Sequence, residues 1–290
     1  MTEFVQYLVG GLATGSVYGL IALGFVLVFK STDVFNFAQG DLLMTGAYIT
    51  VTALVTFKLP LGPAMLVALL AAAVIGLLIQ LLIIRKMLGQ PLLTVVMVTI
   101  ALSLVIRGLV VIIYGPEERT LESTLPNDTL TILGVKVSQL DLTIMAVAAV
   151  CVALFALFFR YTAIGLQMRA TAENPEASAL SGVNSGRVFS LAFALGAVLA
   201  AIGGILLANR QLVSPHLGEV GLLAFPAAVI GGLTSIPGAV VGGIIIGVVE
   251  KLATGYADAA AASVFVYGAL LLMLLIRPYG LFGEREIRRV

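Results

Sequence analysis

Long apolar runs, nearly free of charged residues, constrain this sequence more than any other feature. They form segments near 4–29, 34–57, 62–84, 92–114, 140–159, 188–208, 218–250 and 259–276. One membrane crossing by a helix takes about 20 predominantly apolar residues. Because 60% of the 290 residues are apolar, the chain has material for roughly eight or nine crossings. We therefore expect an all-α fold, a polytopic membrane helical bundle.

Charge and cysteine content exclude other classes of protein. A nucleic-acid-binding protein needs a basic excess, whereas 16 Lys and Arg against 15 Asp and Glu leave a net charge of +1. The single cysteine, Cys151, cannot build a disulfide framework. The continuous apolar runs also differ from the short alternating segments of a β-barrel. The expected surroundings are a lipid bilayer, with no nucleic-acid partner.

Motifs for catalysis and nucleotide binding are missing from the sequence. No G-x-x-x-x-G-K-[ST] loop occurs, so we expect the chain to have no ATP site of its own. The single histidine, His216, supports neither a serine–histidine hydrolase nor a histidine metal cluster. We expect no catalytic residues, no metal ligands and no cofactor, and hence a conduit whose energy source lies elsewhere.

The distribution of basic residues orients the segments, because cytoplasmic loops of membrane proteins are enriched in Lys and Arg. This rule places Arg85, Lys86, the 160–187 loop and the arginine-rich C-terminus in the cytoplasm, and the acidic 115–139 loop outside. Counting the crossings back to the start then places the N-terminus on the outer, periplasmic side.

The segment 218–250 is too long for a single crossing. As one helix its 33 residues would extend roughly 50 Å, against a hydrocarbon core of about 30 Å. Helix-breaking residues lie at its middle, namely Gly231, Gly232, Ser235, Pro237 and Gly238. We expect a broken or re-entrant pair of half-helices, Glu219 to Thr234 and Gly238 to Glu250. Backbone groups freed by such a break favour a place on a substrate pathway, and a plain helical hairpin is the alternative.

The stretch 33–48 carries polar residues and a helix-weakening glycine inside an apolar segment. They are Asn36, Gln39, Gly40 and Asp41. An aspartate in hydrocarbon costs about 2.5–3.5 kcal/mol, so Asp41 is expected to face the bundle interior, a cavity or the interface. We assign these four residues, together with Gly231, Gly232, Ser235 and Pro237, to a substrate pathway.

An alternative for Asp41 is open. If the span begins near Leu42, Asp41 is merely a charge at a helix N-terminus. Arg107, within the 92–114 segment, is expected to extend its side chain to the outer membrane surface rather than contact a substrate.

A short helix is expected in the cytoplasmic 160–187 loop. Asn174 is a good N-cap, Pro175 suits the first helical position, Glu176 complements the helix dipole and Gly182 fits the position past the end. Such a short helix is marginal alone and needs a packing partner. It is either a docking helix for a cytoplasmic protein or a turn against the chain's own loops.

Small residues at four-residue spacing indicate close contacts between membrane helices. Three such ridges occur: Gly11, Gly15 and Gly19; Ala192, Gly196, Ala200 and Gly204; and Gly243 with Gly247. We interpret them as contacts inside the bundle rather than as a dimer seam.

Four sequence blocks resemble a known family. They are VYGLIALGFVLVFKSTDVFNFAQGDLLMTGAY (Val17 to Tyr48), RATAENPEASALSGVN (Arg169 to Asn184), AFPAAVIGGLTSIPGAVVGGIIIGVVE (Ala224 to Glu250) and RPYGLFGE (Arg277 to Glu284). Over essentially its whole length the chain resembles the inner-membrane permease subunits of branched-chain amino acid ABC transporters, of the H type in the Liv system. Gln39 departs from the family pattern, in which many members carry histidine.

The resemblance implies a single transmembrane permease domain over 1–290 with a cytoplasmic coupling loop at 160–187. It also implies four kinds of partner: a second, homologous permease, two cytoplasmic ATP-binding subunits, an extracytoplasmic solute-binding protein and the lipid of the inner membrane. ATP would be bound by the partner subunits. The ATPase-contacting loop of the family maps onto Arg169, Glu173, Asn174, Pro175, Glu176 and Gly182.

Leucine, isoleucine and valine are the substrates that the resemblance implies. Related ABC permeases for urea, amides or other amino acids are an alternative. A stand-alone secondary transporter or channel is a second one, which the absence of an intramembrane proton relay disfavours. An intramembrane enzyme lacks a nucleophile–base pair.

Overall fold

The computed structural model describes residues 2–121, 128–132 and 135–283. Seven of its helices are long and apolar enough to cross a membrane. They are α1 (Thr2–Thr32), α3 (Leu61–Ile79) with its continuation to Met87, α5 (Leu92–Tyr114), α6 (Gln139–Tyr161), α9 (Ser185–Ala208), α11 (Ile236–Tyr256) and α12 (Ala259–Ile276). The 17-residue α2 (Gln39–Val55) and the shorter apolar segment Pro215–Gly231 pack within the same bundle. The expected polytopic helical bundle is confirmed.

The remaining elements are short. A π-helical turn, η1 (Gln80–Ile84), joins α3 to α4 (Arg85–Met87), and the 3₁₀-helix η2 (Pro215–Glu219) precedes α10 (Val220–Gly231). Two helices, α7 (Ala163–Glu173) and α8 (Pro175–Leu180), lie between α6 and α9. The strands β1 (Thr129–Ile132) and β2 (Val135–Ser138) pair antiparallel, with Thr129 opposite Ser138. The sequence did not predict this hairpin within the 115–139 loop.

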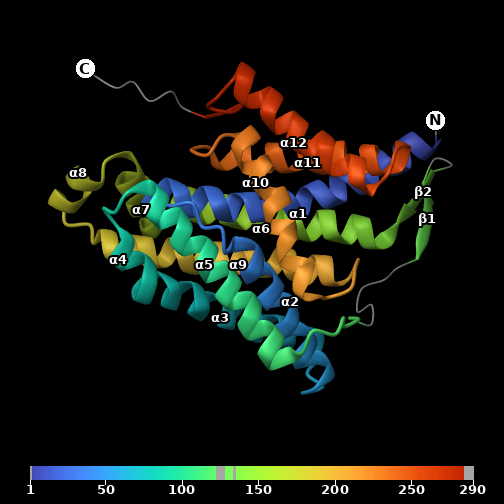
Figure 1. The fold of residues 1–290 in the computed structure, drawn as a ribbon, viewed down its shortest axis with the longest axis horizontal. Coiled ribbons are helices and arrows are strands. Elements are labelled where there is room, and N and C mark those ends of the chain that lie inside the picture. The colour runs from blue at the N-terminus through green and yellow to red at the C-terminus, as the bar shows by residue number, and fades with distance from the viewer. Residues whose placement is uncertain (1, 122–127, 133–134, 284–290) are drawn as a thin grey trace.

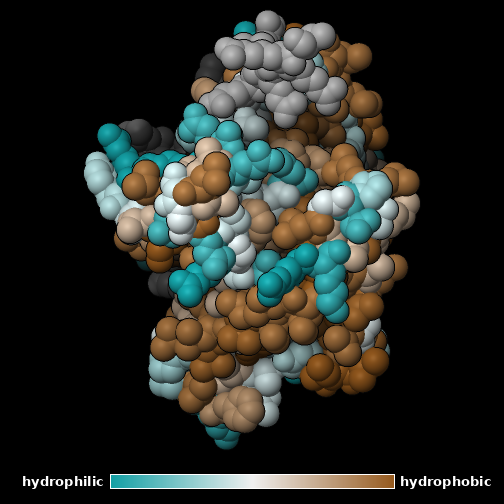
Figure 2. All heavy atoms as spheres, turned by 90° about the vertical axis from the view of Figure 1, so that its left-hand side faces the viewer, coloured by the Kyte–Doolittle hydropathy of each residue, from teal (hydrophilic) through white to brown (hydrophobic). Residues whose placement is uncertain are grey.

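The helices run along the long axis of the molecule, so the bundle has two distinct ends (Figure 1). One carries α4, α7 and α8 and is called the α8 end; the other carries the start of α1 and the β1–β2 hairpin and is called the hairpin end. Figure 2 looks onto the α8 end, where hydrophilic residues gather across the middle of a face bordered by hydrophobic ones.

The centre of the bundle is formed by α1 and α9. In their most apolar windows 78% and 72% of the residues are buried, against 11% in α12. The predicted small-residue ridges lie in this centre. A Cβ added to Gly247 would lie 2.2 Å from the Gly15 nitrogen, and one added to Gly204 would lie 2.1 Å from the Leu43 carbonyl oxygen. Glycine therefore permits backbone contact of α1 with α11 and of α9 with α2, and the interpretation as internal contacts is confirmed.

The predicted break in 218–250 is also present, at 232–235, but the two helices are unequal. The first ends at Gly231, three residues earlier than expected, because Gly232 adopts a left-handed φ of 108°. The second takes in Ile236 and Pro237 and runs on to Tyr256, since proline is tolerated in a first helical turn and Ser235 caps it by accepting from the Gly238 N–H at 3.1 Å.

These two helices form a tight antiparallel hairpin. Gly231 touches the backbone of Gly238, and Gly242 touches Ala227 and Gly231. The 12 residues of α10 extend about 18 Å, only part of the bilayer core. The turn between α10 and α11 is therefore a plain helical hairpin, as the alternative expected. Of the two helices, only α10 is short enough to be a half-helix.

Candidate functional site

The chain between α1 and α2 is the first unusual element of the site. Residues 34–36 are non-helical, and α2 begins only at Gln39, inside the bundle. Polar backbone groups at membrane depth require partners, and the Thr99 hydroxyl donates to the Phe35 carbonyl at 3.0 Å. Ser103, the central residue of α5, donates to the carboxylate of Asp41. The N-terminus of α2 therefore lies near half the depth of the bundle.

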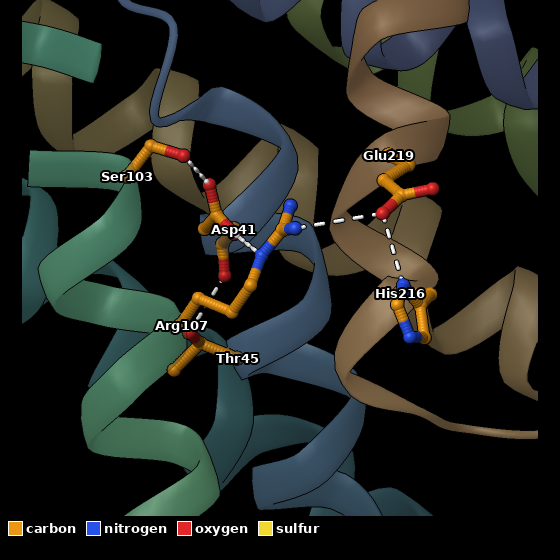
Figure 3. A network of polar contacts seen from close by, with 6 residues as sticks. All are labelled: Asp41, Thr45, Ser103, Arg107, His216 and Glu219. Carbon is orange, nitrogen blue, oxygen red and sulfur yellow. Dashed lines mark hydrogen bonds and ion pairs between the residues drawn. The ribbon is translucent and has the colours of Figure 1, made fainter. Parts of the chain in front are cut away.

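Asp41 is the buried centre of a polar cluster (Figure 3). Its side chain is 2% exposed and accepts from Ser103 and from Arg107, whose Nε lies 3.3 Å from Oδ1. The Thr45 hydroxyl donates to the Asp41 carbonyl at 2.7 Å. Asp41 does lie in the first turn of α2, as the alternative expected, but its carboxylate is held within the bundle.

The cluster extends from Asp41 towards the surface of the bundle. Arg107 places Nη1 3.5 Å from Oε1 of Glu219, and the same oxygen lies 3.0 Å from Nδ1 of His216. Side-chain exposure rises outward, from 30% for Arg107 to 52% for Glu219 and 79% for His216. We call Asp41, Ser103, Arg107, His216 and Glu219 the Arg107 cluster.

This pairing was not predicted from the sequence, and the expectation for the Arg107 side chain was wrong. The guanidinium lies between two carboxylates instead of extending to the outer membrane surface. A usable signal existed, since Arg107 is the single charge in 92–114 and Asp41 the single charge in 34–57. Two opposite charges in separate spans are each costly in hydrocarbon and become tolerable by pairing.

Two helix N-termini meet beside the cluster. A Cβ added to Gly221 would lie 2.4 Å from Cα of Gly40, and one added to Gly40 would lie 2.0 Å from the Gly218 carbonyl oxygen. The starts of α2 and α10 are therefore in backbone contact, which only glycine permits here. Both positive dipole ends face the region of Asp41 and Glu219, where they stabilise negative charge.

Asn36 and Gln39 are buried on the other side of α2. The Asn36 amide donates to Oε1 of Gln39 at 3.4 Å, and the Gln39 amide donates to the Gly196 carbonyl of α9 at 2.8 Å. In this structure both side chains fasten the non-helical segment to the bundle core. Aromatic rings cover the segment, with Phe35 and Phe37 centred 6.0 Å and 5.6 Å from Phe225 of α10.

The other predicted pathway residues lie apart from the cluster, at the α8 end. The Leu281 and Phe282 N–H groups donate to the carbonyls of Ile230 and Gly231, at 2.8 Å and 3.1 Å, and Gly232 touches Gly283. Ser235 and Pro237 line a cavity of about 340 Å³ that Lys30 and Arg160 also line. The structure thus separates the predicted pathway residues into two groups rather than one site.

The predicted cytoplasmic helix is present as α8. Oδ1 of Asn174 accepts from the Ala177 N–H at 2.9 Å, and Pro175 occupies the first turn. Gly182 has a φ of 85°, and the N–H groups of Gly182 and Val183 donate to Ala179 and Ser178, the hydrogen-bond pattern of a Schellman motif.

Exposure divides the six predicted coupling residues. Glu173, Asn174, Pro175, Glu176 and Gly182 are exposed. Arg169 is partly buried, donating to the Arg160 carbonyl at 3.3 Å and lying 5.9 Å from the centre of the Phe159 ring. It therefore holds α7 against the end of α6. Beside the exposed group, Leu180 is 91% exposed, an apolar side chain at the tip of the α8 end.

The described residues include few metal-ligating side chains close to one another. No group of three or more His, Cys, Asp or Glu side chains among them could hold a metal ion. Ion pairs and hydrogen bonds join the members of the Arg107 cluster.

Comparison with known proteins identifies the family. Residues 7–275 match the family model described as "Branched-chain amino acid transport system / permease component". The high-affinity branched-chain amino acid transport system permease protein BraD of Pseudomonas aeruginosa is 33% identical, over 99% of this chain and 98% of that one. LivH of Escherichia coli, a permease protein with the same description, is 30% identical over 99% and 98% of the two chains.

A solved structure shares the fold. It is PsaBC from Streptococcus pneumoniae in complex with Fab, in which the matching chain is 15% identical, with a TM-score of 0.52 over 96% of both chains. The family match spans nearly the whole chain, and the bundle has the membrane helices that such a protein needs. The chain therefore belongs to the branched-chain amino acid transport permease family and is a multi-pass permease subunit of an ABC transporter.

Proposed function

We propose that this chain is one of two homologous permeases in an importer of leucine, isoleucine and valine. The substrates are those of the branched-chain amino acid systems to which its relatives belong. The importer lies in the inner membrane and receives substrate from an extracytoplasmic solute-binding protein. Two cytoplasmic ATPases bind and hydrolyse ATP, which needs no nucleotide site or cofactor on this chain.

The basic residues of the α8 end support an orientation for the permease. Lys30 and Arg160 line one cavity there, and Arg85 and Arg187 line another. Because cytoplasmic surfaces are enriched in Lys and Arg, this end faces the cytoplasm. The start of α1 and the β1–β2 hairpin then face the periplasm, and the chain after α12 lies in the cytoplasm.

The Arg107 cluster is the observation that carries the proposed pathway. Arg107, Glu219 and His216 are increasingly exposed on the side of the bundle, at a depth where lipid would surround a lone chain. A charged side chain costs about 2.5–3.5 kcal/mol in hydrocarbon. This face of α5 and η2 therefore borders water and the second permease, and substrate passes along it.

The charges of the cluster suit an amino acid in transit. The guanidinium attracts the substrate carboxylate, and the outer carboxylate of Glu219 attracts its ammonium group. Phe35, Phe37 and Phe225 lie on the neighbouring segments and supply an apolar wall.

Coupling to the ATPases is assigned to α8. Glu173 at the end of α7 and the exposed Pro175, Glu176 and Leu180 of α8 form a small surface, and the caps at both ends of α8 keep the helix folded. Movement of the ATPases is transmitted through α8 and α7 to the bundle, so that ATP and loaded binding protein favour different states of the pathway. The 160–187 loop is thus the coupling loop of one permease domain.

Glu219→Gln tests the pathway assignment. Leucine uptake is measured in proteoliposomes holding the whole transporter, with ATP inside and binding protein outside. We expect uptake to fall about tenfold, because a hydrogen bond to a charged group is worth about 1.5–3 kcal/mol. Glu3→Gln, the same change on an exposed residue of α1, is the control. Equal uptake by both variants would contradict the assignment of the substrate pathway to this face.

A further inference from the structure

A second polar feature lies apart from the Arg107 cluster. A cavity of about 410 Å³ at the hairpin end is lined by α1, α10, α11, α12 and the end of α9, all within this one chain. Small-molecule sites range from about 300 to 1,000 Å³. The cavity is therefore large enough for a small organic ligand.

Charged groups of both signs line the cavity. They are Arg210, Glu250 and Lys251. Arg210 is already engaged, with Nη2 3.4 Å from Oδ1 of Asp141 and Nη1 donating to the Thr14 hydroxyl at 2.9 Å. The Asp141 carboxylate offsets the charge of Arg210, so Glu250 and Lys251 are the remaining pair of opposite charges.

One carboxylate oxygen of Glu250 lacks a hydrogen-bond donor among the described residues. This atom, Oε2, is buried and accepts no hydrogen bond from the residues that the structure describes. The Tyr18 hydroxyl interacts with the same carboxylate. Glu250 lines the cavity, and a carboxylate inside a membrane protein is expensive unless it is paired, so a ligand with a cationic N–H donor would stabilise it.

The charge pattern selects the class of ligand. Lys251 would repel a simple cation, and Glu250 would repel a simple anion. A zwitterion satisfies both, with its ammonium group on the Glu250 carboxylate and its carboxylate on Lys251. Leu207, Val220 and Leu223 complete the lining with an apolar surface, which suits a short aliphatic side chain.

We propose that this cavity binds a free aliphatic amino acid in its zwitterionic form. The choice of leucine as the probe rests on the proposed function; the ligand class rests on the cavity. The site lies against the same helix as the Arg107 cluster, because Val220 and Leu223 of α10 line it and Glu219 directly precedes α10. It is separate from the face along which substrate passes.

Equilibrium binding tests the proposal. Radiolabelled leucine is titrated onto the intact transporter in nanodiscs, without binding protein or ATP, and saturable binding is expected. Glu250→Gln should weaken leucine binding about tenfold or more, since it removes one charge from a charge-assisted hydrogen bond. Ala262→Leu, which adds a side chain to the cavity lining, should abolish binding, and the control Glu3→Gln should leave it unchanged.

Two analogues of leucine show which group of the ligand contacts Glu250. Leucinamide lacks the carboxylate and 4-methylpentanoate lacks the ammonium group. Glu250→Gln should weaken leucinamide binding as it weakens leucine binding, and it should strengthen 4-methylpentanoate binding, because it removes the charge that repels this anion. Binding of leucine with wild-type affinity by both Glu250→Gln and Ala262→Leu would overturn the proposal, as would no saturable binding by the wild type.

Uptake separates this inference from the proposed function. If the transporter imports no branched-chain amino acid but binds leucine in a Glu250-dependent manner, the proposed function fails and the cavity site stands. If import proceeds and the wild type shows no Glu250-dependent binding, the cavity site alone fails.

Discussion

At the scale of single residues, the Asp41–Arg107 pair connects stability with function. Asp41 is 2% exposed and has two donors, whereas Arg107 reaches the surface of the bundle. Removing one partner of a buried pair leaves the other charge uncompensated, at a cost of about 3–5 kcal/mol. The inner half of the cluster is therefore structural, and its outer half is available to a substrate.

A double-mutant cycle measures this pair. Arg107→Gln should lower the free energy of unfolding by about 3 kcal/mol, since Asp41 keeps its charge without a counter-ion. Adding Asp41→Asn should restore more than half of that loss. The measurement is unfolding of the purified permease in detergent, and simple additivity of the two single changes would contradict the coupling.

The sequence predicted Asp41 and Gln39 as notable residues but not their partners. A charge or amide within an apolar run is visible in the sequence alone. That Arg107 contacts Asp41 and that Gln39 contacts Gly196 depends on how distant segments pack. The pairing of opposite charges in separate spans was the one signal available for the first contact.

At the scale of elements, the sequence predicted a helix correctly where residues close together in the chain determine its two ends. The Asn174 cap, Pro175 and Gly182 define α8 without help from other segments. The bounds of α10 and α11 were less accurate, because Ser235 and Pro237 can begin a helix as well as interrupt one. The β1–β2 hairpin was missed because its two strands are only four residues each.

Reversing a charge on α8 tests its role. Glu176→Lys should leave the permease inserted and the helix folded, because Glu176 is exposed and the Asn174 cap is untouched. ATP hydrolysis should continue while leucine uptake falls at least about fivefold, a change of about 1 kcal/mol. Both rates are measured in the same proteoliposomes. Wild-type uptake would exclude docking through this residue.

The contact between α1 and α11 gives a stability prediction. A Cβ on Gly15 would lie 2.7 Å from Cα of Ile244, whereas one on Gly268 of α12 meets nothing within 4 Å. Gly15→Leu must therefore separate two central helices and should lower the yield of folded permease severalfold. Gly268→Leu should leave the yield unchanged in size-exclusion chromatography. Similar yields would show that the contact can relax.

At the scale of the whole molecule, the surface is asymmetric. The outward sides of α3, α5, α6 and α12 expose large apolar side chains, as lipid requires, and the Arg107 cluster interrupts this surface beside η2. The fold class followed from the apolar runs, but this asymmetry could not, because it depends on which side of each helix the bundle leaves uncovered.

Photo-crosslinking tests whether the proposed second permease lies against this face. In a Cys151→Ala background, His216→Cys labelled with benzophenone maleimide should form an adduct with the partner permease, because this face is assigned to the permease interface. Leu275→Cys, at an 86% exposed position of α12, should form none. Adducts are identified by mass in membranes that contain the whole transporter. An adduct from Leu275→Cys alone would place the interface on the opposite side.

The contact of residues 281–282 with the α10–α11 turn sets an order for biogenesis. The carbonyl groups of Ile230 and Gly231 accept hydrogen bonds from the N–H groups of Leu281 and Phe282, which lie some fifty residues later in the chain. While α11 and α12 are still leaving the ribosome, those carbonyls have only water or the translocon as partners. The half-helix beside the Arg107 cluster is thus completed only after α12 has been synthesised.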